Sequence, residues 1–172
     1  MLNQYASVLP SGGAPGYDAD GNMITDGTFS YSWDGENRLV LASNGTTVVE
    51  NAYDYMGRRV GKVVDGVTNT FVYDGWAMIQ EGVDGGTNRF VYGLDLSGTM
   101  QGAGTIGGLL LADFNGTAAF YGYDANGNVT ELIDANGSRL AHYEYDPFGN
   151  IVRQTGPAAD DNPIRFSKKY WD

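Results

Sequence analysis

The chain contains no cysteine and only one histidine among its 172 residues. Without thiols it can form neither disulfide bonds nor the thiolate centres that hold structural zinc. The single histidine, His142, has no second imidazole with which to share a metal, and no nucleophile motif accompanies it. We therefore expect no catalytic residue and no metal site, and we interpret His142 as a structural or surface residue.

Positive charge and long apolar runs are scarce as well. The chain has 10 Lys and Arg against 21 Asp and Glu, a formal net charge of −11. Because such a surface repels phosphate backbones, we expect no nucleic-acid partner. No stretch approaches the roughly 18 apolar residues that span a membrane, and the N-terminal "MLNQYASVLPSGG" lacks the basic and apolar regions of a signal peptide. We expect no membrane span, and an export signal for this chain would lie elsewhere.

Glycine and aromatic residues are abundant. The 26 glycines are about twice the usual share of about 7%. There are also 12 Tyr, 7 Phe and 3 Trp, and hydrophobic residues make up 42% of the chain, which argues against disorder. Glycine serves turns with positive φ and aromatic residues suit pleated surfaces, so this composition indicates an all-β protein with many turns.

One short pattern recurs along the chain: an aromatic residue followed by Asp, with Gly shortly after. Most copies start 16 to 22 residues apart. The copies are Tyr17-Asp18 with Gly21, Trp33-Asp34 with Gly35, Tyr53-Asp54 with Gly57, Tyr73-Asp74 with Gly75, Tyr123-Asp124 with Gly127, and Tyr145-Asp146-Pro147 with Gly149, while Tyr92-Gly93 is a degenerate copy. Repetition at this period predicts stacked supersecondary units.

Each unit has the pattern of a strand, a turn and a second strand. Polar and apolar residues alternate in "FSYSW" and "RLAHYEYD", and Asp-Gly or Asn-Gly pairs punctuate the strands, most clearly in "VVDGVTNTF" and "LADFNGTAAF". The motif Asp can accept hydrogen bonds from the backbone N–H groups of its turn, and the motif Tyr can pack on the neighbouring repeat. Because one hairpin cannot bury its own face, we predict antiparallel hairpin repeats in a spiralling ribbon.

Gly102-x-Gly104-x-x-Gly107 has the spacing of the dinucleotide-binding fingerprint. Such a site needs a helix after the glycines, since the helix N-terminus holds the pyrophosphate. The residues that follow, "LLLADFNGTAAFYGYD", alternate as a hairpin instead. We therefore predict a structural loop here and expect no cofactor.

Two segments begin like calcium loops, at Asp18 and at Asp124. Neither has Gly at the sixth position or Glu at the twelfth, which an EF-hand requires. Turn-forming repeats are the better interpretation of both. The many tyrosines leave a carbohydrate-contact surface open as an alternative to packing between repeats.

The repeats resemble those of the YD-repeat proteins, also called RHS (rearrangement hotspot) repeat proteins, whose shell is shared with the teneurins. The stretch "YDANGNVTELIDANGSRLAHYEYDPFGNIVRQTG" is similar to the YD consensus, and "NPIRFSKKYWD" resembles the opening of the RHS-associated core. "YGLDLSGTMQGAGTIGGLL" resembles a segment that precedes the last repeats in some bacterial members. The resemblance divides the chain into an N-terminal extension (1–16), a repeat ribbon (17–155) with a glycine-rich insertion (93–108), and a truncated start of the core (156–172).

The resemblance implies a non-enzymatic structural module of a YD shell, part of a larger bacterial protein that is secreted or held at the cell surface. Its expected partners are other parts of the same shell and an enclosed toxin or effector. The alternatives are an adhesion module that binds carbohydrate or a cell-surface partner, and the self-cleaving core of a toxin precursor. With about seven repeat units the chain is expected to be a shell fragment, without an autocleavage site, that is marginally stable alone or self-associates through its strand edges.

Overall fold

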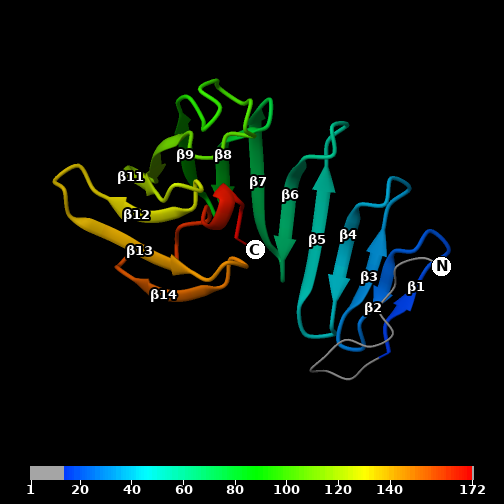
Figure 1. The fold of residues 1–172 in the computed structure, drawn as a ribbon. Helices are drawn as coiled ribbons and strands as arrows, with labels where there is room; N and C mark the ends of the chain where they lie inside the picture. The colour runs from blue at the N-terminus through cyan, green and yellow to red at the C-terminus, as the bar shows by residue number, and fades with distance from the viewer. Residues whose placement is uncertain (1–13, 172) are drawn as a thin grey trace. The chain divides into compact units, whose positions relative to one another are not determined.

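A computed structural model describes residues 14–171 and shows an all-β protein (Figure 1). The described residues contain fourteen strands and one short 3-10 helix. The predicted fold class of antiparallel hairpin repeats is confirmed. The chain divides between Phe71 and Val72 into two compact units.

The first unit is a meander in which each strand pairs antiparallel with its neighbours in the chain. The predicted two-residue turn at Asp65-Gly66 is present, because Val64 pairs with Val67 across it. The strands are β1 (Gly16–Tyr17), β2 (Met23–Thr25), β3 (Ser30–Trp33), β4 (Leu39–Ser43), β5 (Val48–Tyr53), β6 (Arg59–Val64) and β7 (Val67–Asp74), whose last residues belong to the second unit.

The second unit continues the same plan. Phe114 pairs with Thr117 across the predicted Asn115-Gly116 turn. The elements are β8 (Ala77–Val83), β9 (Gly86–Tyr92), β10 (Leu109–Phe114), β11 (Thr117–Tyr123), β12 (Val129–Ile133), β13 (Arg139–Tyr145), β14 (Ile151–Thr155) and the 3-10 helix η1 (Phe166–Lys168). Consecutive strands from β8 to β14 are antiparallel neighbours.

The strand register shifts at the motif aromatic in several repeats. Such irregularities bend a strand and re-aim the side chain that follows. They occur between Gly16 and Tyr17, Ser32 and Trp33, Ala52 and Tyr53, Gly122 and Tyr123, and Glu144 and Tyr145. At these positions the aromatic side chain therefore departs from the regular alternation of side chains between the two faces of the sheet.

The two units differ in their cores. Among the described residues of the first unit, Ala42 and Phe71 are the buried hydrophobic side chains. The second unit buries many more: Ala77, Met78, Phe90, Leu109, Ala112, Ala119, Val129, Leu132, Ala141, Tyr143, Ala159 and Ile164. Ala159 and Ile164 lie beyond the last strand, so the segment after β14 is part of this core.

Candidate functional site

Six turns share one five-residue loop that is built around an aspartate. In the loop that follows Trp33, Oδ1 of Asp34 accepts hydrogen bonds from the N–H groups of Glu36 (2.9 Å) and Arg38 (3.0 Å), and Oδ2 accepts from Nε of Arg38 (2.7 Å). The predicted Asx turn is thus present. The same backbone pattern is found at Asp18, Asp54, Asp124, Asp134 and Asp146.

These hydrogen bonds keep the aspartates ionised. The backbone N–H of Arg38 is the main cause that lowers the pKa of Asp34. The side-chain amides of Asn22 and Asn150 are the main causes that lower the pKa of Asp18 and Asp146. A carboxylate that accepts these bonds acts as a structural group, because charge-assisted hydrogen bonds to the backbone fix the turn.

The third residue after each of these aspartates has a left-handed backbone. It is Gly21, Gly57, Gly127, Gly137 and Gly149 in five loops. In the loop after Trp33 it is Asn37, with φ of 59°, so Gly35 is not the turn glycine of that repeat. The loop at Asp134 was missed because Ile133 stands where the repeat pattern requires an aromatic residue. An Asp-x-x-Gly search would have found it.

The motif aromatic joins the open end of its own hairpin. The hydroxyl of Tyr53, at the end of β5, donates to the carbonyl of Leu39, the first residue of β4 (2.9 Å). The sequence analysis expected packing on a neighbouring repeat and missed this hydrogen bond. The equivalent donors and acceptors are Trp33 Nε1 and Met23, Tyr92 and Met78, Tyr123 and Leu109, and Tyr145 and Val129.

Tyr73 and Asp74 do not form the five-residue loop. Both belong to β7, and a two-residue turn, Gly75-Trp76, follows them. The side chain of Gln101 holds this turn: Nε2 donates to the carbonyl of Asp74 (3.0 Å), and Oε1 accepts from the N–H of Trp76 (2.9 Å). Residues of the glycine-rich stretch therefore hold a turn of the ribbon.

The glycine-rich residues 93–108 connect β9 to β10 and fold around Asp95. Burial raises the pKa of Asp95, but hydrogen bonds from Ser97, Ala103 and Thr105 outweigh it and lower the pKa to about 2. The loop thus surrounds a carboxylate of its own, and a strand follows it. This geometry is that of a structural loop and lacks the helix N-terminus of a dinucleotide site.

The segment after β14 turns back onto the sheet at Gly156. Its φ is 110°, and a Cβ at this position would lie 2.4 Å from the carbonyl oxygen of Leu140. The turn allows the N–H of Ala158 to donate to that carbonyl (2.9 Å), and the hydroxyl of Tyr143 to donate to the carbonyl of Ala159 (2.7 Å). Figure 1 shows η1 beside β12. We call residues 156–171 the docked segment.

Two buried polar residues fix the docked segment. Asn162 is fully buried and accepts a hydrogen bond from the hydroxyl of Tyr121 (2.6 Å). Arg165, 5% exposed, donates from Nε to the carbonyl of Asn162 (2.9 Å). Its guanidinium also lies over the rings of Tyr143 and Trp171, at 5.5 and 4.9 Å. These buried polar contacts hold the docked segment on the sheet.

The repeat loops also contact the docked segment. The side-chain oxygen of Asn128 accepts from the N–H of Ser167 (2.9 Å). The ring of Phe166 packs edge-on against Tyr145, 5.4 Å between centroids, and occupies the space beside Gly149. The loops at 124–128 and 146–150 thus form part of the surface that holds this segment.

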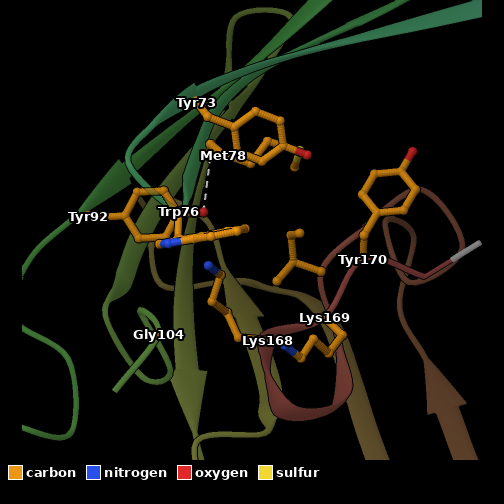
Figure 2. A pocket seen from close by; sticks show the side chains of 9 residues that line it. Tyr73, Trp76, Met78, Tyr92, Gly104, Lys168, Lys169 and Tyr170 are labelled. Atoms are coloured by element: carbon orange, nitrogen blue, oxygen red, sulfur yellow. Dashed lines mark hydrogen bonds between the residues drawn. The ribbon is translucent and has the colours of Figure 1, made fainter. Parts of the chain in front are cut away.

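A pocket of about 390 Å³ lies between the docked segment and the ribbon (Figure 2). Its lining combines aromatic and apolar side chains with two lysines. The lining residues are Tyr73, Trp76, Met78, Tyr92, Gly104, Ile164, Lys168, Lys169 and Tyr170. The sequence analysis singled out neither lysine as a site residue.

His142 belongs to a surface ion-pair network. Its ring nitrogens lie 3.1 Å from Glu144 and 2.6 Å from Glu131, and these carboxylates, Glu144 first, raise its pKa. His142 is half-buried on β13, and its structural or surface role stays a prediction. In residues 14–171 no three or more side chains of the metal-ligating types are grouped to hold a metal ion. The described part of the chain also has no helix of the length and apolarity that a membrane crossing needs.

Several known proteins are similar to this chain in sequence. A sequence model of the family described as RHS Repeat matches residues 123–160. The tRNA3(Ser)-specific nuclease WapA of Bacillus spizizenii is 30% identical, and the tRNA nuclease WapA of Bacillus subtilis 29%, over the whole chain. The double-stranded DNA deaminase toxin A of Burkholderia cenocepacia is 27% identical over 91% of the chain. The chain spans 7% of the length of the two nucleases and 13% of the deaminase toxin.

Solved structures share the fold. The TcdB2-TccC3 complex without its hypervariable C-terminal region superposes with a TM-score of 0.65 at 16% identity, and the Photorhabdus luminescens Tc holotoxin pore with 0.62 at 15%. Each match covers 91% of this chain and 8% of the other. At these identities the likeness concerns the fold of the repeats.

Proposed function

Since this chain is an RHS/YD-repeat protein, we propose that it is a non-enzymatic structural module of a YD shell that encloses or presents a toxin or effector polypeptide. One observation carries the proposal: most of the described motif side chains form hydrogen bonds inside the ribbon. The carboxylates of six turns bind their own loops, and the aromatic donors of five hairpins bind backbone carbonyls. Side chains engaged in this way support the architecture of the ribbon.

The relatives support an association with toxins. Two of the matched proteins are named as tRNA nucleases and one as a DNA deaminase toxin. The matched stretch is a small part of each, so an activity of this kind enters the proposal only as the cargo of the shell. The same association favours a larger protein that is secreted or held at the cell surface.

Other shell repeats are the expected neighbours of this module. Among the described strands, β14 pairs on one side with β13 and ends the strand order. A free strand edge is a template for another strand. The docked segment would be the start of the RHS-associated core, held by the loops at 124–128 and 146–150. The alternative of a carbohydrate surface receives no such support, because the motif tyrosines are half-buried with their hydroxyls bonded to carbonyls.

Limited proteolysis of the longest polypeptide that contains this chain tests enclosure. We expect the cargo to resist proteolysis until the repeats unfold, and Tyr145→Ala to expose the cargo at a lower temperature. A cargo that is cleaved at once while the repeats stay folded would contradict enclosure.

Intact-mass measurement and incubation with tRNA and double-stranded DNA test whether the module is non-enzymatic. We expect the purified chain to keep its mass and to leave both nucleic acids unchanged. A discrete self-cleavage that a single Asp→Asn change abolishes, or any turnover of nucleic acid, would show an enzyme.

A further inference from the structure

Lys168, a half-buried cation of the docked segment, faces the ribbon. Its ammonium lies 4.6 Å from the centroid of the Tyr92 ring and donates to the hydroxyl of Thr105. No carboxylate pairs with Lys168 among the described residues 14–171. Lysines that lose water normally gain an acidic partner, so within the described residues the charge of Lys168 is left unbalanced.

Both partners in this contact have an uncommon backbone. Thr105 is fully buried with φ of 67°, and Lys168 has φ of 53°. A left-handed backbone is uncommon for any residue other than glycine, and most unfavourable for a β-branched one. Such residues persist where the surroundings fix them, often at binding sites. The ammonium is therefore placed by structure that costs free energy to maintain.

The electrostatic surroundings of the pocket favour an anion. Desolvation, and then the charge of Lys169, lower the pKa of Lys168 to about 8, so the amine is still mostly protonated at neutral pH. Lys169 is exposed and lines the same pocket. In a chain with a net charge of −11, the two lysines make the lining of this pocket locally positive.

The walls of the pocket favour a flat apolar body. Figure 2 shows the side chain of Lys168 directed toward Trp76 and Tyr92. The side chain of Trp76 is 58% exposed, although an indole is normally well buried. Met78 and Ile164 add apolar surface. A cavity of about 390 Å³ with apolar walls and a few polar groups is typical of small-molecule sites.

We propose that this pocket binds a small organic anion, a carboxylate on a flat apolar body. The carboxylate would pair with the ammonium groups of Lys168 and Lys169, and the body would lie against Trp76 and Tyr92. This inference goes beyond the structural role of the shell and does not depend on it. It assigns to the chain a ligand site that neither the repeat motif nor the proposed cargo requires.

Binding of the organic anion should weaken as the pH rises. The other titratable groups at the pocket are Tyr73 of β7, Tyr92 of β9, and Lys169 and Tyr170 of the docked segment, while Glu81 of β8 accepts from the Tyr170 hydroxyl. Burial raises the pKa of Tyr92 above its ordinary value of 10.0, so it stays neutral. Affinity should hold between pH 6 and pH 7 and fall as the pH rises through about 8, where free Lys168 loses its proton.

Isothermal titration calorimetry of the full chain with phenylpropionate tests the proposal, with phenylpropanamide as the neutral probe of the same shape. We expect the amide and the Lys168→Met variant each to bind at least roughly tenfold more weakly, a difference of about 1.4 kcal/mol. Lys62→Met, a change of a lysine on β6 outside the pocket, should bind as the parent does. Phenylpropionate affinity should also fall roughly tenfold between pH 7 and pH 10.

Trp76→Ala is the second variant, because it removes a wall and keeps the charge. This variant should weaken the binding of phenylpropionate and leave the weak binding of acetate unchanged. Circular dichroism should show that both pocket variants are folded. Absence of phenylpropionate binding would overturn the proposal. Equal binding of acid and amide, or unchanged binding by a folded Lys168→Met, would overturn it as well.

Discussion

The hydroxyl of Tyr145 donates to the carbonyl of Val129 across 2.9 Å and so joins the last residue of β13 to the first residue of β12. The turn at residues 134–138 closes the other end of this hairpin. Tyr145 also contacts Phe166 of the docked segment. One motif side chain thus fixes its own hairpin and supports the element that covers it.

Tyr145→Phe should lower the free energy of unfolding by about 1 kcal/mol, because it removes one hydrogen bond and keeps the ring. Tyr145→Ala should cost more, about 3 kcal/mol or above, since the ring contacts are lost too. Urea unfolding followed by circular dichroism measures both. Tyr55→Phe is the control, as Tyr55 is 90% exposed, and an equal loss there would argue against the assigned role.

Asp34→Asn should lower the urea midpoint, whereas Asp74→Asn should change it little. Both aspartates follow an aromatic residue, but Asp34 holds a five-residue loop and an ion pair with Arg38. Asp74 ends a strand before a two-residue turn. Urea unfolding of the two variants compares an aspartate that holds a five-residue loop with one that only follows an aromatic residue. Equal losses in the two variants would show that the loop contributes nothing further.

Acid should destabilise the chain. The folded-state pKa of Asp18, Asp34, Asp54, Asp124, Asp134 and Asp146 is lowered. Their contribution is complete above the unfolded value of about 3.9 and disappears as the pH falls through the lowered values. The thermal unfolding midpoint, measured from pH 7 to pH 2, should decrease once the pH is below about 4. A midpoint that stays constant below pH 4 would exclude a contribution of these carboxylates to stability.

Gly156→Ala should loosen the docked segment. The added Cβ would meet the carbonyl of Leu140, and an L residue is strained at φ of 110°. We expect faster hydrogen exchange at the N–H groups of Ala158 and Asn162, with the strands of the first unit unaffected. Gly35→Ala is a matched control, because nothing lies within 4 Å of a Cβ at that position.

Hydrogen exchange should also distinguish the two units. Few side chains are buried in β2–β5, whereas β10–β13 contribute Leu109, Val129, Leu132 and Tyr143 to a core. Local opening is easier where less apolar surface is buried. Amides of β2–β5 should therefore exchange first, and uniform protection would indicate a single cooperative unit.

The repeat spacing predicted the antiparallel hairpins, their two-residue turns and the Asx loops, since all of these depend on residues close in the chain. The acceptor of each motif aromatic was missed, because it lies at the far side of a hairpin. The left-handed position of the loop after Trp33 was missed, because Asn37 stands there in place of the expected glycine. The contact of Lys168 with Thr105 joins residues 63 apart in sequence, and only tertiary packing brings them together.

The hydrogen bonds of five motif aromatics, Trp33, Tyr53, Tyr92, Tyr123 and Tyr145, each stay within one hairpin. Deleting or duplicating such a hairpin would leave the aromatic hydrogen bonds of the other hairpins intact. Shells of different length could therefore arise from one another by recombination between repeats, with the loops that hold the docked segment as the part whose sequence must be kept.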